Sequence, residues 1–227
     1  DFDGVDDRVD VGVIDIVGNE MSLAAWFRVD DFDVLDGRLV SKARDVFDAD
    51  HYWMLSTLQQ GGAFRLRFRL MAGGVTNTLI ATDGDLLIGE WIHVAAVYDG
   101  AEMRLYKDGV LVGSRPKTGV IDVNPAVSVA IGNQPAGAGP RPFDGSIDDV
   151  RVYDRVLSEA EILQLSTPWF PDCNANLLDD ALDISSGTSL DCNLNGVPDE
   201  CDVAEATSLD CNANGIPDEC DLLTTSL

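Results

Sequence analysis

The chain has 227 residues, 45% of them hydrophobic, and its 40 acidic against 15 basic side chains give a net charge of −25. This apolar content is enough for a sizeable core, and the sequence has no run of about 18 uncharged apolar residues that would cross a bilayer. The electrostatic field of so negative a protein repels nucleic-acid phosphates and anionic lipid and attracts divalent cations. We therefore expect a folded, cation-binding protein with no nucleic-acid partner and no membrane insertion.

The charge is divided unevenly along the chain. Residues 168–227 hold 13 of the acidic side chains, all five cysteines and no lysine or arginine. The junction at 168–171 reads Pro-Trp-Phe-Pro, and its two prolines favour an extended linker. We predict a first domain over 1–167, a linker over 168–171 whose two aromatic side chains dock the tail, and a separate tail over 172–227.

The first domain reads as a series of strands. Short apolar or alternating runs bounded by Gly, Asp or Asn predict antiparallel strands at 21–29, 38–43, 52–58, 63–71, 91–98 and 127–132. The pair Asp108-Gly109 predicts a type I′ hairpin turn, and the capping box of Ser158 with Glu161 predicts one short helix. In the run 64–70, three arginines alternate with four apolar residues. We expect a solvated arginine face, with an anionic-ligand site as the alternative.

Several separated motifs in this domain resemble those of one family. They are FDGVDD at 2–7, WIHVA at 91–95, YKDG at 106–109, IDDVRVY at 147–153 and LSEAEI at 157–162. In this order they resemble a laminin G-like, concanavalin A-like jelly roll over about residues 1–165. The resemblance implies a mainly β fold, an antiparallel two-sheet sandwich with one short C-terminal helix. Asp148 resembles the calcium-binding position of related sandwiches, and turn-forming aspartates are the alternative explanation.

The same domain lacks the residues of a known catalytic pattern. Some glycoside hydrolases of this architecture carry Glu-x-Asp-x-x-Glu on a strand, so that the carboxylates face one cleft, and no such triplet occurs here. We expect His93, inside an apolar strand, to be a core residue, and His51 to lie in a loop. No serine nucleophile elbow is present. The sequence therefore predicts that the protein is not an enzyme.

The tail contains one twelve-residue motif three times, at a period of 19 residues. Oxygen-bearing side chains recur at loop positions 1, 3, 5, 9 and 12, and Gly stands at position 6 in the second and third copies. This is the ligand spacing of an EF-hand-type calcium loop, in which the carbonyl of position 7 also faces the ion. Hard oxygen donors in this number favour calcium over magnesium and zinc. The predicted ligands are Asp172, Asn174, Asn176, Leu178, Asp180, Asp183, Asp191, Asn193, Asn195, Val197, Asp199, Asp202, Asp210, Asn212, Asn214, Ile216, Asp218 and Asp221.

The chain between the loops is too short for a true EF-hand. Only seven residues separate one loop from the next, which leaves no room for two flanking helices. With the sequence NGVPDECD, the motif looks more like the type 3 repeats of thrombospondins, which the resemblance implies are calcium loops with disulfides and almost no hydrophobic core. Because each loop without metal holds three mutually repelling carboxylates, we expect calcium to supply the free energy that orders the tail.

The five cysteines suggest disulfides and an oxidising, extracellular compartment. Two bridges among five cysteines allow 15 pairings. Positions 2 and 11 of one loop carry Cys192 with Cys201, and Cys211 with Cys220. We favour these pairs within repeats, which leave Cys173 single.

These observations predict a non-enzymatic, extracellular, calcium-binding module. In it, the jelly roll recognises glycan or an extracellular protein and is carried on a calcium-rigidified stalk. One alternative is a structural subunit that self-associates into an extracellular fibre or surface matrix. Another is an accessory domain of a secreted polysaccharide hydrolase, whose catalytic residues would lie outside this chain.

Overall fold

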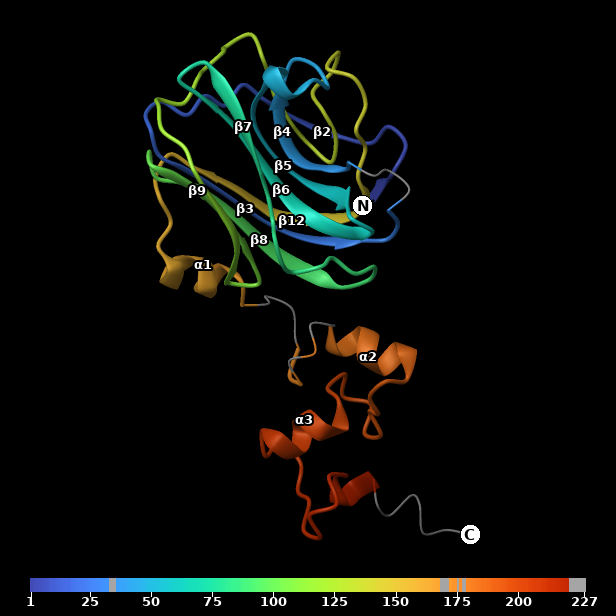
Figure 1. Cartoon of the computed structure of the whole chain (residues 1–227). Helices are drawn as coiled ribbons and strands as arrows, with labels where there is room; N and C mark the ends of the chain where they lie inside the picture. The colour runs from blue at the N-terminus through green and yellow to red at the C-terminus, as the bar shows by residue number, and fades with distance from the viewer. Residues whose placement is uncertain (33–35, 168–171, 175, 177–178, 221–227) are drawn as a thin grey trace. The chain divides into compact units, whose positions relative to one another are not determined.

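A computed structural model describes residues 1–32, 36–167, 172–174, 176 and 179–220 of the chain (Figure 1). The chain forms two compact units, Asp1–Thr167 and Pro168–Leu227. The predicted linker, with the aromatic residues Trp169 and Phe170 that were expected to dock the tail, lies outside the described residues.

The first unit is a sandwich of two six-stranded antiparallel sheets, which confirms the predicted mainly β jelly-roll fold (Figure 1). The first sheet, in spatial order, consists of β1 (Phe2–Asp3), β12 (Asp144–Tyr153), β3 (Met21–Val29), β8 (Trp91–Tyr98), β9 (Glu102–Lys107) and β10 (Val110–Pro116). The second consists of β2 (Val9–Gly12), β11 (Val129–Ile131), β4 (Arg38–Ala43), β5 (His51–Gln60), β6 (Ala63–Ala72) and β7 (Val75–Ile80).

The strongest sequence signals gave strands with the expected bounds. β3, β4 and β8 have the predicted bounds. The side chains of all three strands are buried on both faces, and the runs of β3 and β8 are nearly continuously apolar. Four strands were not predicted: β12, β1 at the edge of the first sheet, and β2 and β7 at the two edges of the second sheet. β2 is exposed along its whole length, and β7 is exposed or half-buried except at Leu79. Neither therefore carries a strong hydrophobic pattern.

The core lies between the two sheets and is built by alternation. In β6, the side chains of Leu66, Phe68 and Leu70 enter the core, and their partners on β5 are Thr57, Leu55 and Trp53. The turn after β9 is the predicted hairpin, since both of its central residues have positive φ, 49° at Asp108 and 78° at Gly109.

A short helix packs on the outer face of the first sheet. α1 (Glu159–Leu165) begins at Ser158, whose hydroxyl accepts from the Glu161 N–H while the Glu161 carboxylate accepts from the Ser158 N–H. This confirms the predicted capping box. Ile162 is fully buried in a small apolar cluster with side chains of β3, β8 and β9. The indole of Trp26 also donates to the Leu165 carbonyl at 3.2 Å.

The expectation of a solvated arginine face on β6 was wrong for two of its three arginines. Arg67 and Arg69 are 3% and 7% exposed. Arg67 donates to Ser56 at 3.0 Å and pairs with Asp36, which also pairs with the fully buried Arg38. Burial lowers the pKa of the Arg67 guanidinium to about 9, against the opposing attraction of Asp36. The arginines are therefore part of a buried charge network rather than a wet face.

Both histidines are buried in strands. His93 is 2% exposed and lies 5.5 Å, ring to ring, from Trp26, which confirms its core position. The prediction of a loop position for His51 was wrong, because it is the first residue of β5 and fully buried. Its ring lies within hydrogen-bonding distance of Arg38 and of the Phe47 carbonyl. Burial is the main cause that lowers both imidazole pKa values to about 4.

The second unit repeats a loop followed by a short helix. Its helices are α2 (Asp180–Ser186) and α3 (Asp199–Ala204), and residues 218–220 are also helical. Each helix begins at the ninth position of its loop. The described buried side chains of this unit are mainly aspartates and cysteines rather than large apolar groups, as expected for a core-poor tail.

Candidate metal centre

Each loop is folded by its own aspartate and asparagine side chains. In the second loop, the Asp191 carboxylate accepts from the backbone N–H of Asn195 at 3.1 Å and of Gly196 at 2.9 Å. Gly196 has φ of 86°, a left-handed conformation that glycine adopts at little cost. The third loop repeats these bonds from Asp210 to Asn214 and Gly215. Short oxygen side chains that cap backbone N–H groups therefore wrap the chain into a ring.

The side chains at positions 3, 5 and 12 converge inside this ring. In the second loop, the amides of Asn193 and Asn195 donate to Asp202 Oδ2 at 3.0 and 2.9 Å. In the first loop, Asn174 and Asn176 donate to Asp183 Oδ2 at 3.1 and 2.8 Å.

The converging carboxylates are charged and buried. Asp183 and Asp202 are 0% and 2% exposed. Burial acts to raise the pKa of Asp183, but hydrogen bonds from Asn176, Thr188 and Asn174 outweigh it, so the pKa is lowered. For Asp202 the hydrogen bond from Thr207 is the largest cause and also lowers the pKa. Since residues 168–227 contain no lysine or arginine, these buried charges have no cationic side chain of their own unit to pair with.

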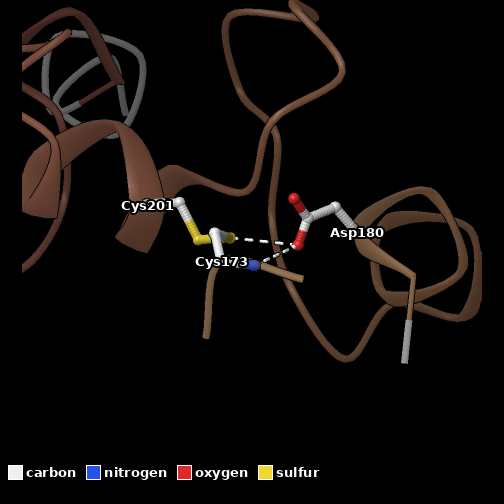
Figure 2. A group of neighbouring side chains, drawn as sticks. All are labelled: Cys173, Asp180 and Cys201. Atoms are coloured by element: carbon white, nitrogen blue, oxygen red, sulfur yellow. Dashed lines mark hydrogen bonds between the residues drawn. A yellow bond between two sulfur atoms is a disulfide. The ribbon is translucent and has the colours of Figure 1, made fainter. Parts of the chain in front are cut away.

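The aspartates at position 9, which are also predicted ligands, bond to the backbone at the start of their own loop. Asp180, Asp199 and Asp218 each accept the backbone N–H of the cysteine at position 2 of their own loop, at 3.0, 2.9 and 2.9 Å. Figure 2 shows Asp180 between its helix and the disulfide of Cys173. The position 9 carboxylate therefore joins the first residue of the helix to the start of the loop.

The structure describes some of the remaining predicted ligands but not all of them. The Val197 and Ile216 N–H groups donate to Asn195 and Asn214 Oδ1 at 2.7 and 2.8 Å, so position 7 lies beside position 5 in both loops. Leu178 and Asp221 lie outside the described residues, as does the fold of the first loop at its sixth position. Asp172 and Asn212 each accept the backbone N–H of the residue at position 5 of their own loop.

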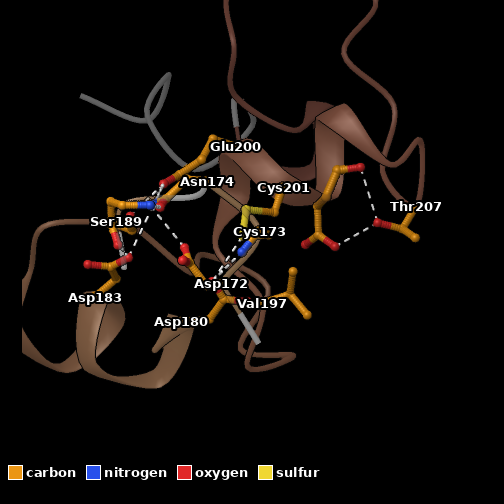
Figure 3. Close-up of a disulfide and its surroundings, with 12 residues drawn as sticks. Asp172, Cys173, Asn174, Asp180, Asp183, Ser189, Val197, Glu200, Cys201 and Thr207 are labelled. Carbon is orange, nitrogen blue, oxygen red and sulfur yellow. Dashed lines mark hydrogen bonds between the residues drawn. A yellow bond between two sulfur atoms is a disulfide. The ribbon is translucent and has the colours of Figure 1, made fainter. Parts of the chain in front are cut away.

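The predicted disulfides within repeats were wrong. Cys173 is bonded to Cys201 and Cys192 to Cys220, each across 28 residues with a Cα–Cα distance of 5.8 Å, and Cys211 is free. Position 11 lies on the helix of its repeat, and Cys201 at this position faces Cys173 of the preceding loop (Figure 3). The bridges therefore join neighbouring repeats. A signal for this was present, because only the first repeat, which has no loop before it, has Leu at position 11.

Two residues at these loops were not predicted. Glu200 accepts from Ser189 at 2.5 Å and from the Asn174 amide at 3.4 Å, although Asn174 belongs to the preceding loop (Figure 3). Glu219 likewise accepts from Ser208 at 2.6 Å, and the side chain of Asn193 in the preceding loop adds to the lowering of its pKa by Ser208. The EF-hand spacing assigns no ligand to position 10, and the sequence therefore did not predict these two glutamates as ligands.

The jelly roll has its own shallow surface features. A hollow of about 350 Å³ lies between Arg44, Asn124 and the loop 135–138, and one of about 300 Å³ lies between Arg8, Asn133 and the same loop. Asp3, Asp6 and Asp7 are exposed and gather within 4.8 Å.

Asp148, the position that resembled a calcium site, is not part of the exposed aspartate group near the N-terminus. Its carboxylate accepts the backbone N–H of Asp149, and Asp149 pairs with Arg151 at 2.8 Å. In the described ranges, no helix is long and apolar enough to cross a membrane.

Comparison with known proteins concerns the first unit. The family model of the concanavalin A-like lectin/glucanases superfamily matches residues 3–163. The adhesion G-protein coupled receptor V1 of Danio rerio is 26% identical over 132 residues, which are 57% of this chain and 2% of the receptor. The chain therefore spans a small fraction of the length of this relative.

Solved structures share the sandwich. A SAP-like pentraxin from Limulus polyphemus superimposes with a TM-score of 0.56 at 16% identity, over 78% of this chain and 83% of that one. The CBM40 domain of the Ruminococcus gnavus IT-sialidase, solved with α2,3-sialyllactose, gives 0.53 at 17% identity, over 70% and 97%. At these identities the likeness shows a common fold.

Proposed function

Because the chain belongs to the concanavalin A-like lectin/glucanases superfamily over residues 3–163, we propose that it is a non-catalytic, extracellular binding module. Its jelly roll recognises glycan, and its acidic repeats bind calcium. The observation that carries the calcium assignment is the pair of buried carboxylates, Asp183 and Asp202, in a unit without any basic side chain. Buried charges in proteins are paired or coordinate metals.

The donor set of the repeats fits calcium. Side-chain oxygens of positions 1, 3, 5 and 12 would hold the ion, together with the position 7 carbonyl. The cysteines at these loops offer no thiolate where they are joined in disulfides, so a softer metal such as zinc has no advantage. Bound calcium supplies the positive charge that the unit lacks. The two disulfides also support an extracellular location.

Calorimetry on the chelator-treated full chain tests the calcium assignment. We expect about three calcium ions to bind, one for each loop, as the repeat count predicts. In chelator, limited proteolysis read on a reducing gel should cut residues 172–220 before the jelly roll, which has its own core. A chain that binds no calcium and keeps its tail protected from protease would overturn the assignment.

Glycan recognition is supported by the family and by the two hollows that flank the loop 135–138. A glycan array probed with the full chain tests it. The exposed Ala136 lines both hollows, so Ala136→Trp should fill them and abolish binding. Val75→Trp, at a site on β7 that is 59% exposed and lines neither hollow, is the matched control. An array without hits, or equal loss in both variants, would favour a protein partner instead.

The absence of catalysis is part of the proposal. Both histidines are buried and have pKa values near 4, so neither is placed to act as a general base for a surface substrate. We expect no release of reducing sugar from polysaccharides. Turnover that follows the protein through repurification would contradict this.

A further inference from the structure

The glutamate at position 10 of a repeat reaches back to the loop before it. Glu200 Oε1 lies 3.4 Å from the amide nitrogen of Asn174 and accepts from Ser189 at 2.5 Å (Figure 3). The same amide nitrogen lies 3.1 Å from Asp183 Oδ2. One donor therefore stands between an aspartate of its own repeat and a glutamate of the next.

The next boundary has a related arrangement. Glu219 accepts from Ser208 at 2.6 Å, and this bond, with a smaller contribution from the side-chain amide of Asn193 in the preceding loop, lowers the pKa of the Glu219 carboxyl. That amide also donates to Asp202 Oδ2 at 3.0 Å. The serine bond to the position 10 glutamate therefore occurs at both boundaries.

A disulfide fixes each glutamate in this position. Cys201 follows Glu200 in the chain, and its partner Cys173 precedes Asn174. The bridge of Cys192 with Cys220 holds the corresponding residues at the second boundary. Two neighbouring pairs, one covalent and one polar, therefore align the helix of a repeat with the preceding loop.

The sequence of the first repeat supports a link between these two pairs. Positions 10 and 11 read Glu-Cys in the second and third repeats, which follow another loop. They read Ala181-Leu182 in the first repeat, which does not. The glutamate and the cysteine therefore both occur only in the two repeats that follow another loop.

We propose that Glu200 and Glu219 are additional calcium ligands, each supplied across a repeat boundary to the loop before it. This rests on the calcium binding proposed above. An EF-hand loop ends in a glutamate that gives the ion two oxygens, whereas these loops end in the shorter aspartate. In the first loop, Thr188 donates to Asp183 Oδ1 at 2.9 Å, so only Oδ2 faces the asparagines. The glutamate of the next repeat supplies the missing oxygen and negative charge.

A calcium titration of the full chain, followed by backbone amide NMR, tests this. The amide of Gly196 reports on the second loop and that of Gly215 on the third. Glu219→Gln should raise the calcium midpoint at Gly196 about tenfold, because ligand charge tunes the affinity of such loops, and should leave Gly215 unchanged. Glu200→Gln should do the same to the first loop, read at Asn176. None of the described residues offers a glutamate to the third loop, which is the internal reference.

The control is Glu205→Gln, at the end of α3, which should leave every midpoint unchanged. Glutamine keeps an oxygen that accepts from the serine hydroxyl, so the variants should retain their fold. The two glutamates act on separate loops, so each variant is decisive by itself. Wild-type affinity in either variant would overturn the assignment of that glutamate as a ligand while calcium binding stands. A wild-type chain without calcium response would instead overturn the calcium-binding function.

Discussion

The two buried histidines should make the jelly roll sensitive to mild acid. An unfolded histidine takes up its proton near pH 6.5, whereas His51 and His93 resist protonation until a pH of about 4. Between these values the unfolded chain binds more protons, so the free energy of unfolding falls as the pH falls. The stabilising contribution is complete above pH 6.5 and lost as the pH approaches 4.

The size of the effect follows from these values. A pKa lowered from 6.5 to about 4 corresponds to about 3 kcal/mol per histidine over the whole range. Between pH 7 and pH 5 the expected loss is about 2 kcal/mol for each side chain, or about 4 kcal/mol for both. This is a large part of the stability of an ordinary domain.

Two measurements check this prediction. The chain has only two histidines, so NMR resolves both imidazoles, and neither should titrate between pH 8 and pH 5. Urea unfolding at pH 7 and pH 5 should show the loss of stability. His93→Phe is the matched variant, because it keeps a ring beside Trp26 and because His93 Nδ1 has no hydrogen-bond partner among the described atoms. It should lose about half of the pH dependence. A His93 signal that titrates near pH 6.5, or equal pH dependence in wild type and variant, would refute the reasoning.

Five further substitutions, two of them controls, test the fold by urea unfolding. Asp36→Ala leaves two buried guanidiniums without their carboxylate and should cost about 3–5 kcal/mol, whereas Asp10→Ala, at the exposed pair with Arg8, should cost less than about 1 kcal/mol. Gly145→Ala places a Cβ 2.0 Å from a backbone oxygen, while Gly137→Ala meets nothing within 4 Å; both have positive φ, so the first should be less stable by at least about 1–3 kcal/mol. Ser158→Ala removes the cap of α1 and should cost about 1 kcal/mol. Equal losses within either pair, or an unchanged Ser158→Ala, would contradict the corresponding contact.

The sequence was most informative where burial is local and continuous. The runs of β3 and β8 are apolar on both faces, so their bounds could be predicted. The arginines of β6 could not, because a charged side chain is normally solvated. Here a carboxylate from a distant loop, Asp36, pairs with Arg67 and keeps it buried. Long-range pairing of this kind leaves no periodic signal.

The candidate metal loops show the same limit. Their spacing predicted which side chains share a ring, and the structure brings Asn193, Asn195 and Asp202 together as that spacing requires. The spacing did not predict which loop a cysteine or glutamate faces, because that depends on how one repeat packs on the next. Only the exception in the first repeat, with its Leu182, pointed to pairing between repeats.

The two disulfides overlap along the chain, since Cys192 lies between Cys173 and Cys201. Every peptide bond from Cys173 to Cys220 is therefore spanned by at least one bridge. A single cut in this stretch changes the mass of the protein by one water molecule and releases no fragment until the bridges are reduced. A protease that nicks one repeat would thus leave whatever is attached to either side still tethered, whereas bridges within repeats would have let the two halves separate after a cut between Cys201 and Cys211.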